Sequence, residues 1–187
     1  MLAYRLITII FSPFILAHII WKSVSNKQAR YFWQRLGFGY SKLPMGCTWF
    51  HCASVGEVNT LLPLLKNLHA QDPKLQFTIT SNTITGGKIV AQQNLPYLFH
   101  SYLPFEWSFA IRRFIGSTRP AVLFVVETEI WPNLFHQCHR HGIDIHIINA
   151  RLSSQTTTAH AWVTHLLKSS SANVSSISAR SAQDPKA

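Results

Sequence analysis

Short apolar runs alternate with longer helical patterns from Cys47 onward, and this alternation constrains the fold more than any other feature of the chain. Residues 121–126 read AVLFVV, which is typical of a strand buried on both faces. Alternation with short connections predicts an α/β fold, a Rossmann-like parallel sheet with helices on both faces. We expect strands at residues 47–52, 75–81, 98–103, 121–126, 144–149 and 174–179. We expect helices at residues 56–70, 85–93, 106–116, 131–141 and 158–169.

The glutamates of this chain all fall at turns that follow apolar runs; they are Glu57, Glu106, Glu127 and Glu129. Open α/β sheets hold their ligands at the carboxyl ends of the strands, where such turns lie. Glu127 and Glu129 point the same way only if a turn interrupts the strand between them. We therefore expect Glu57 and this acidic pair to meet at one mouth of the sheet, whereas Glu106 is expected to begin a helix.

The charge balance limits the classes of partner. Seventeen Lys and Arg against seven Asp and Glu give a formal net charge of +10, which favours acidic partners. Nucleic acid, anionic lipid and phosphorylated substrates all meet that description. No nucleic-acid-binding motif accompanies the basic residues, so no nucleic-acid partner is expected.

The cysteines and histidines indicate neither a disulfide framework nor a metal site. Three cysteines with no CxxC pair are typical of a reducing compartment. His136 and His139 have helical spacing that could ligate a metal, but a carboxylate ligand is not evident. We therefore expect no metal, and we interpret the cationic end of the segment His136, Cys138, His139 and His141 as a helix carboxyl terminus.

The amino-terminal residues 6–21 are apolar apart from Thr8, Ser12 and His18. Sixteen helical residues reach about 24 Å, slightly less than a hydrocarbon core of about 30 Å, and counting from Met1 makes the span sufficient. A single membrane-anchor helix at 1–22 is expected, with a buried helix of a soluble domain as the alternative. Basic residues follow it in a helical stretch at 22–36, which places the downstream domain in the cytoplasm.

Five motifs occur in an order that carries a family resemblance: HCASVGE at 51–57, ITSNTITGG at 79–87, YLPFEW at 102–107, ETEIWPN at 127–133 and NARLS at 149–153. Together they resemble the amino-terminal half of 3-deoxy-D-manno-octulosonic acid (Kdo) transferases, bacterial inner-membrane enzymes that transfer Kdo from CMP-Kdo to a lipid A precursor, lipid IVA. The resemblance implies the amino-terminal domain of a two-domain GT-B glycosyltransferase. The family enzymes have roughly twice this length.

The resemblance implies roles for individual residues. Glu57 matches the general base of the family. Substrate-binding roles are expected for Ser54, Gly56, Thr83, Thr85, Gly86, Glu127, Glu129, Asn149 and Arg151. No cofactor is implied beyond the donor CMP-Kdo.

Ordinary structural roles are the alternative explanation for several of these residues. Glu57 and Glu129 would each suit the positive end of a helix dipole. The loop from Thr83 to Gly87 offers backbone N–H groups to a phosphate, but a helix cap with a tight turn would use the same residues. Arg151 could pair with an anionic substrate group or with one of the acids.

These observations predict a Kdo transferase of lipopolysaccharide biosynthesis at the inner membrane, in contact with anionic lipid. The expected organisation is a membrane-anchor helix at 1–22, a basic juxtamembrane helix and linker at 23–46, an acceptor-binding domain at 47–180, and a tail at 181–187 where a second domain would begin. Such a half is expected to transfer little alone and to need a carboxyl-terminal domain, encoded separately or otherwise. The alternative functions are a noncatalytic membrane-associated module that binds acidic lipid and a soluble nucleotide-binding domain.

Overall fold

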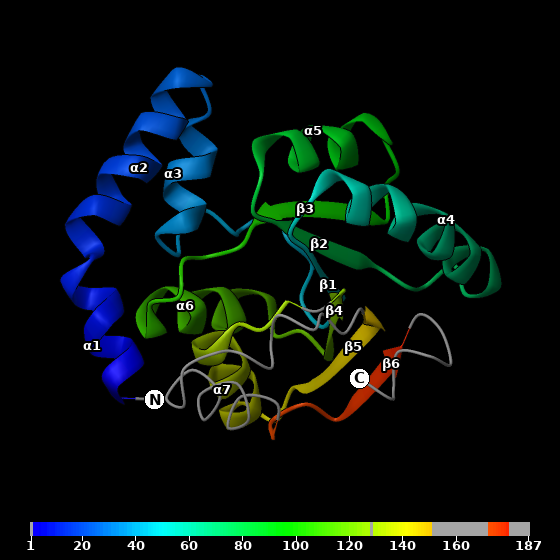
Figure 1. The fold of residues 1–187 in the computed structure, drawn as a ribbon. Coiled ribbons are helices and arrows are strands. Elements are labelled where there is room, and N and C mark those ends of the chain that lie inside the picture. Colours follow the sequence, from blue (N-terminus) through cyan, green and yellow to red (C-terminus); the bar gives the residue numbers. More distant parts are fainter. Residues whose placement is uncertain (1, 128, 151–171, 180–187) are drawn as a thin grey trace.

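The structure is a computed structural model that describes residues 2–127, 129–150 and 172–179. Its centre is a parallel sheet of six described strands in the order β3-β2-β1-β4-β5-β6 (Figure 1). The strands are β1 (Thr48–Cys52), β2 (Phe77–Ser81), β3 (Leu98–Tyr102), β4 (Val122–Val126), β5 (Asp144–Ala150) and β6 (Ser176–Ala179). The predicted parallel α/β sheet is confirmed, because each expected strand is present within two residues of its expected ends.

Helices cover both faces of the sheet. They are α4 (Val55–Gln71) and α5 (Ile84–Gln92) on one face, and α6 (Ser108–Thr118) and α7 (Pro132–Arg140) on the other (Figure 1). Two separate apolar cores result: Trp49 of β1 packs with the α6 and α7 side, and its neighbour Phe50 packs with the α4 side. The alternation of side chains along a strand therefore serves both cores. The helix expected at 158–169 lies outside the described residues.

The amino-terminal segment folds as two helices where a single anchor helix was expected. Helices α1 (Leu2–Ile10) and α2 (Ser12–Ser25) meet at an angle of 59°. Pro13 lies in the first turn of α2, where its lack of an N–H is tolerated at a helix start but breaks a continuous helix. In the part of the chain that the structure describes, no single helix is long and apolar enough to cross a membrane, although this bent pair passes on length and composition.

The prediction of a single basic helix at 22–36 is also wrong, because two helices share this range. Helix α2 ends at Ser25, Lys27 adopts a left-handed conformation with φ 51°, and α3 (Ala29–Arg35) begins a new direction. The Ser23 hydroxyl donates to the Gln28 carbonyl at 2.8 Å and so stabilises this turn. As a result α3 packs back along α2 and reaches the edge of the sheet (Figure 1).

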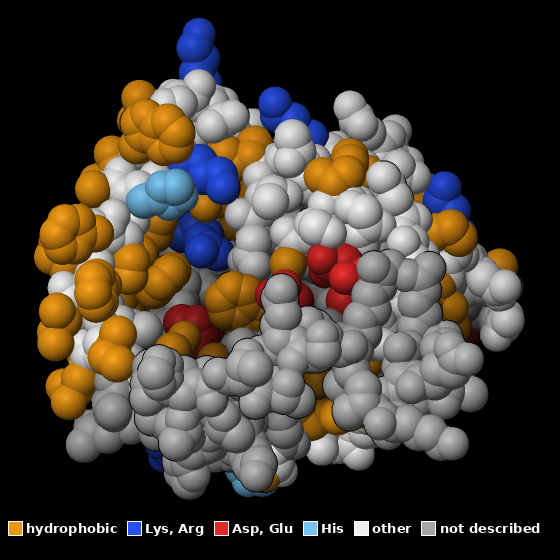
Figure 2. Space-filling view, in the orientation of Figure 1, with side chains coloured by type: hydrophobic (Ala, Val, Ile, Leu, Met, Phe, Trp, Pro, Cys, Tyr) orange, Lys and Arg blue, Asp and Glu red, His pale blue; other side chains and the backbone are white. Residues whose placement is uncertain are grey.

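Helices α1 and α2 have one face toward the body and one apolar face toward solvent. On the inner face, Tyr4 donates to Glu106 at 3.0 Å, Arg5 Nε donates to Asn133 at 3.3 Å, and the indole of Trp107 donates to Ser12 Oγ at 3.0 Å. The outer face exposes a continuous set of large side chains, seen on the left of Figure 2: Leu6, Ile7, Ile9, Ile10, Phe11, Phe14, Ile20, Trp21 and Val24. Polar contacts thus fix α1 and the start of α2 to the domain, and farther along α2 the buried Ile19 packs in an apolar cluster with Tyr31, Ile84 and Tyr102. The opposite side of both helices presents apolar surface outward.

Candidate active site at the ends of β1 and β4

Glu57 lies in the first turn of α4, immediately after β1, as expected. Its backbone N–H donates to Ser54 Oγ at 3.2 Å, and its carboxylate Oε2 accepts from the Ala53 N–H at 2.7 Å. This reciprocal arrangement is a capping box shifted by one residue, so the structural role of Glu57 is real. The side chain is 6% exposed, and Oε1 accepts no hydrogen bond from any described residue. Within the described chain, one carboxylate oxygen is therefore held in place by a hydrogen bond and the other is not.

The acidic pair follows a turn that sharply redirects the chain after β4. Glu127 has a left-handed backbone with φ 62°, and its N–H still donates to the Ile148 carbonyl at 2.9 Å. β4 ends at Val126, before both acids, so the strand does not continue through them, which is the condition for both to serve one site.

The three carboxylates influence one another electrostatically. Burial raises the pKa of Glu129, and the negative charges of Glu57 and Glu127 raise it further, while Trp131 opposes the increase. Figure 2 shows acidic side chains gathered over the ends of β1 and β4. Glu57 and Glu127 thus lie within electrostatic reach of Glu129, and a shared site for the three carboxylates stays a prediction.

Two of the five described non-glycine residues with a positive φ lie at this end of the sheet. Glu127 and Asn149 both have a left-handed conformation, with φ 62° and φ 56°. The pairing of β5 with β6 shifts register between Ile147 and Ala150, beside Asn149. Non-glycine residues in this region cost roughly 1–3 kcal/mol each and cluster at functional sites. Asparagine tolerates the conformation better than glutamate does, so Glu127 is the more strained position.

The loop before α5 already forms the amino-terminal cap of that helix. Thr83 Oγ1 accepts from the Gly86 N–H at 3.1 Å, and the Ser81 hydroxyl donates to the Thr83 carbonyl at 3.0 Å. Thr85 is exposed and Gly86 is buried. The capping role weighed for this loop is therefore present, and substrate binding by these residues stays a prediction.

Arg35 is a residue that sequence reasoning did not assign to the site. Its Nη1 donates to Asn82 at 3.1 Å and to the Leu103 carbonyl at 2.8 Å, and its buried Nε has no partner among the described residues. The guanidinium faces the rings of Tyr31 and Phe105 at 5.8 and 5.6 Å. Burial lowers the pKa of Arg35. No local motif could identify Arg35, because its partners lie 47 and 68 residues away in the sequence.

His51 is not among the site residues predicted from the sequence, but it is fully buried beneath this region. Its Nδ1 lies 3.1 Å from Thr80 Oγ1, its ring meets Trp131 edge-on at 5.7 Å, and its buried Nε2 has no partner within the described chain. Burial lowers the pKa of His51 to about 3, and the charge of Arg35 acts in the same direction. His51 is therefore neutral at physiological pH.

Glu106 has a structural role that differs from the expected one. It does not begin a helix, since α6 starts at Ser108. Its carboxylate instead accepts from the N–H groups of Asn133 and Leu134, both at 2.8 Å, and so caps the start of α7. Because Tyr4 also donates to it, Glu106 joins three distant segments. Burial raises its pKa, which these hydrogen bonds oppose.

The possible metal ligands and Arg151 remain among the residues considered from the sequence. No cluster of three or more His, Cys, Asp or Glu able to hold a metal ion occurs among the described residues, and Cys138 is buried in the core. Arg151 lies outside the described residues. Its expected pairing with an anion or an acid stays a prediction.

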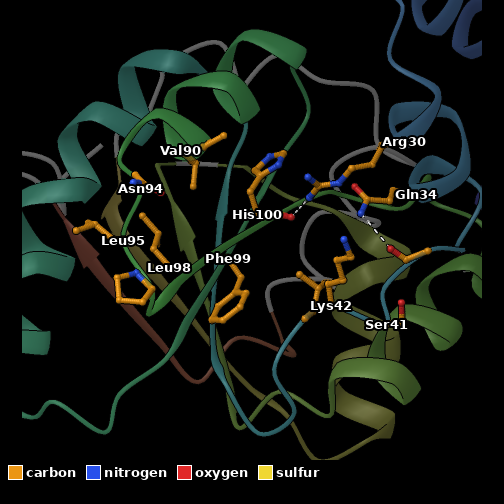
Figure 3. A pocket seen from close by; sticks show the side chains of 14 residues that line it. Arg30, Gln34, Ser41, Lys42, Val90, Asn94, Leu95, Leu98, Phe99 and His100 are labelled. Atoms are coloured by element: carbon orange, nitrogen blue, oxygen red, sulfur yellow. Dashed lines mark hydrogen bonds between the residues drawn. The ribbon is translucent and has the colours of Figure 1, made fainter.

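A cavity of about 590 Å³ lies at the outer edge of β3, two strands away from β1. Figure 3 shows Arg30 and Gln34 of α3 on one side of it and Val90 and Asn94 on the other. Arg30 donates to the His100 carbonyl, and Gln34 Oε1 accepts from the Tyr102 N–H at 3.0 Å. These contacts cover an exposed sheet edge, which explains the arrangement without a ligand.

Comparison with known proteins supplies a family. The family model described as 3-deoxy-D-manno-octulosonic-acid transferase (kdotransferase) matches residues 30–187. A Haemophilus influenzae protein named 3-deoxy-D-manno-octulosonic acid transferase is 36% identical over 183 residues, which cover 95% of this chain and 42% of that protein. A probable mitochondrial transferase of the same name from Arabidopsis thaliana is 29% identical over 166 residues, covering 88% of this chain and 37% of that protein. The chain spans less than half the length of these relatives.

Proposed function

The chain belongs to the 3-deoxy-D-manno-octulosonic acid transferase family, and we propose that it forms the acceptor-binding part of a Kdo transferase in lipopolysaccharide biosynthesis. The complete reaction would transfer Kdo from CMP-Kdo to lipid IVA. The observation that carries this proposal is the position of Glu57, held by its cap beside Glu127 and Glu129 at the carboxyl ends of β1 and β4.

The proposed chemistry uses Glu57 as the general base. It takes the proton from a glucosamine hydroxyl of the acceptor, the hydroxyl oxygen bonds to the anomeric carbon of Kdo, and the bond from that carbon to the CMP phosphate breaks. The hydrogen bond from Ala53 fixes the carboxylate for this step. Glu129, whose pKa is raised by burial and by its acidic neighbours, is suited to hold a proton and donate a hydrogen bond to the acceptor.

The acceptor proposed here is an anionic amphiphile, and the chain has complementary properties. Its formal net charge is +10, and helices α1 and α2 expose a broad apolar face. Apolar surface beside basic residues favours the surface of a membrane that contains anionic lipid. We propose that the domain lies on the cytoplasmic side of the inner membrane, attached through α1 and α2.

The donor is proposed to bind mainly outside this chain's described residues. In the GT-B arrangement, a carboxyl-terminal domain holds the nucleotide sugar across a cleft from the acceptor. The relatives of this chain are more than twice as long as the region they share with it, which is consistent with such a domain. A carboxyl-terminal domain is therefore a proposed partner, in the same polypeptide or in another.

Glu57→Gln tests the proposal sharply, because glutamine can still accept the hydrogen bond from Ala53 but cannot take a proton. Transfer of Kdo to lipid IVA is measured with the chain combined with a carboxyl-terminal Kdo transferase domain. We expect transfer to fall by about 10²–10⁴-fold, the range for loss of a general base. Lys66→Gln is the control: it changes an exposed side chain farther along the same helix, and it should keep most of the transfer.

Retention of full transfer by Glu57→Gln would show that Glu57 is only a helix cap. If the combined protein binds lipid IVA but transfers no Kdo even with the natural glutamate, the noncatalytic lipid-binding module becomes the better description. The reciprocal capping of Glu57 is the observation that keeps this second function open.

A further inference from the structure

A second cavity of about 580 Å³ lies between α1, the start of α2 and α6. Thr8, Ile9 and Leu16 line it from the amino-terminal helices, and Trp107 and Phe109 line it from the start of α6. Its walls are almost wholly apolar. The volume is within the range of small-molecule sites, roughly 300–1,000 Å³, and such a lining suits a hydrocarbon chain.

The charged residues that line this cavity are two arginines and one glutamate. Arg5 and Arg112 both line it. Arg5 donates through Nε to Asn133, but its Nη2 is buried without a partner among the described residues. Such a group costs about 1–3 kcal/mol and calls for an explanation such as an absent ion. The positive charge of Arg5 lies at this cavity and favours an anionic group there.

The carboxylate that lines this cavity already accepts hydrogen bonds from the protein. Glu106 lines it, yet its carboxylate accepts hydrogen bonds from Tyr4, Asn133 and Leu134. These bonds direct it toward the start of α7. The Arg5 and Arg112 guanidinium groups therefore keep an attraction for a further anion, with Arg112 exposed at the rim.

The cavity adjoins the apolar outer face of α1. Ile9 contributes to the cavity wall and also belongs to the exposed face of α1, so the two apolar surfaces are continuous. Figure 2 shows the molecule hollowed between the apolar helices and the gathered acidic side chains, with Lys and Arg side chains along the hollow. A ligand with an acyl chain in the cavity could extend its polar part along this hollow.

We propose that this cavity binds one acyl chain of the acceptor lipid, with a phosphate of its headgroup at Arg5 and Arg112. This proposal rests on the proposed function, because it takes the occupant to be the acylated acceptor. It adds a substrate determinant: the enzyme selects an acylated, phosphorylated acceptor through a pocket that is separate from the catalytic acids. The break between α1 and α2 shapes this pocket, since Ser12 at the break accepts from Trp107.

The test compares a substitution that fills the cavity with one that does not. Thr8→Phe places a ring in the cavity, whereas Ile7→Phe enlarges a side chain of the same helix that is 40% exposed and does not line it. Arg112→Gln removes charge at the rim, and its matched control is Arg113→Gln on the same helix, where Arg113 stacks on Phe38 at 4.0 Å. Binding of radiolabelled lipid IVA to the chain is measured first, with unlabelled phosphatidylglycerol as competitor.

We expect Thr8→Phe and Arg112→Gln each to weaken binding of lipid IVA by about tenfold or more, while both controls bind as the natural chain does. In the transfer assay with a carboxyl-terminal domain, the same two variants should raise KM for lipid IVA with kcat nearly unchanged. A deacylated acceptor should show no difference between Thr8→Phe and Ile7→Phe.

Three results would overturn the proposal without touching the assignment of Glu57. Equal binding of lipid IVA by Thr8→Phe and Ile7→Phe would exclude the cavity. Equal displacement of lipid IVA by phosphatidylglycerol would show a site for bulk membrane lipid. Loss of kcat with unchanged KM in Arg112→Gln would place that residue in the reaction rather than in acceptor selection. Failure of the proposed function appears separately, as transfer that survives Glu57→Gln.

Discussion

Glu57 combines a structural and a chemical role in one side chain. One oxygen of its carboxylate completes the cap of α4, and the same bond holds the group beside two further acids. The cap could be predicted from the sequence, because Ser54 and Glu57 have the spacing of a capping box. The convergence with Glu129 could be predicted only as a condition, because it depends on the left-handed turn at Glu127.

Glu129 gives a prediction for the dependence of stability on pH. Its pKa is raised in the folded chain by burial and by Glu57 and Glu127, so its ionised form destabilises the fold. The stability that Glu129 contributes is present below its unfolded pKa and is lost as pH rises through the folded pKa. Glu129→Gln should therefore raise the unfolding free energy at pH 8, with a smaller gain at pH 4, measured by urea unfolding.

A Glu57→Gln background supplies the control for this experiment. Because the charge of Glu57 contributes to the raised pKa of Glu129, the gain at pH 8 should be smaller in that background. An equal gain in both backgrounds would mean that the two carboxylates do not share a site.

The contacts of Arg35 and His51 could not be predicted from the sequence around each residue. Arg35 meets partners from two other loops, and His51 takes its environment from β2 and from Trp131. Their contacts are created by the order of the strands. A sequence read locally offers no signal for such pairings.

At the scale of elements, hydrophobic periodicity predicted the sheet and the helices that cover it. The strands from β1 to β5 read as apolar runs because helices bury both of their faces. The amino-terminal elements were predicted less well. The apolar pattern alone does not reveal the break at Phe11, although Pro13 is a sequence signal for it. Nor does the pattern reveal the reversal at Lys27 that brings α3 to the edge of β3.

The packing of α5 against β3 gives a prediction with a matched control. A Cβ at Gly87 would lie 2.5 Å from Cε1 of His100, whose Nε2 is held by Ser81 at 2.9 Å. Gly87→Ala should therefore lower the unfolding free energy by about 1–3 kcal/mol, as overpacked cores do, even though alanine is the better helix former.

Gly116 in α6 is the control, because a Cβ there meets nothing within 4 Å. Gly116→Ala should raise the unfolding free energy by about 0.5–1 kcal/mol through helix propensity alone. Urea unfolding measures both variants. Similar stability of the two would refute close packing of α5 on His100.

At the scale of the whole molecule, the apolar flank of α1 and α2 predicts binding to membranes. Ile10 is 69% exposed and Phe14 is 74% exposed. The double variant Ile10→Asp, Phe14→Asp should partition at least about tenfold less onto vesicles containing phosphatidylglycerol, because it removes apolar contact and adds negative charge. Co-sedimentation with the vesicles measures the partition.

A second double variant carries the same change of charge elsewhere. Leu64→Asp, Met45→Asp alters exposed apolar residues outside α1 and α2, with exposures of 44% and 62%, and should keep most of the partition. Equal loss in both double variants would assign membrane binding to net charge instead of to the apolar flank.

The polar bonds between α1 and the body have a practical consequence for anyone preparing this protein. Truncating the first helices, the usual route to a detergent-free sample, would take Tyr4 away from the buried Glu106 carboxylate and Ser12 away from the Trp107 indole. The shortened product would then expose the wall of α6 and aggregate. Solubilising substitutions on the outward side of α1 and α2 would keep these bonds and are the better starting point for crystallisation.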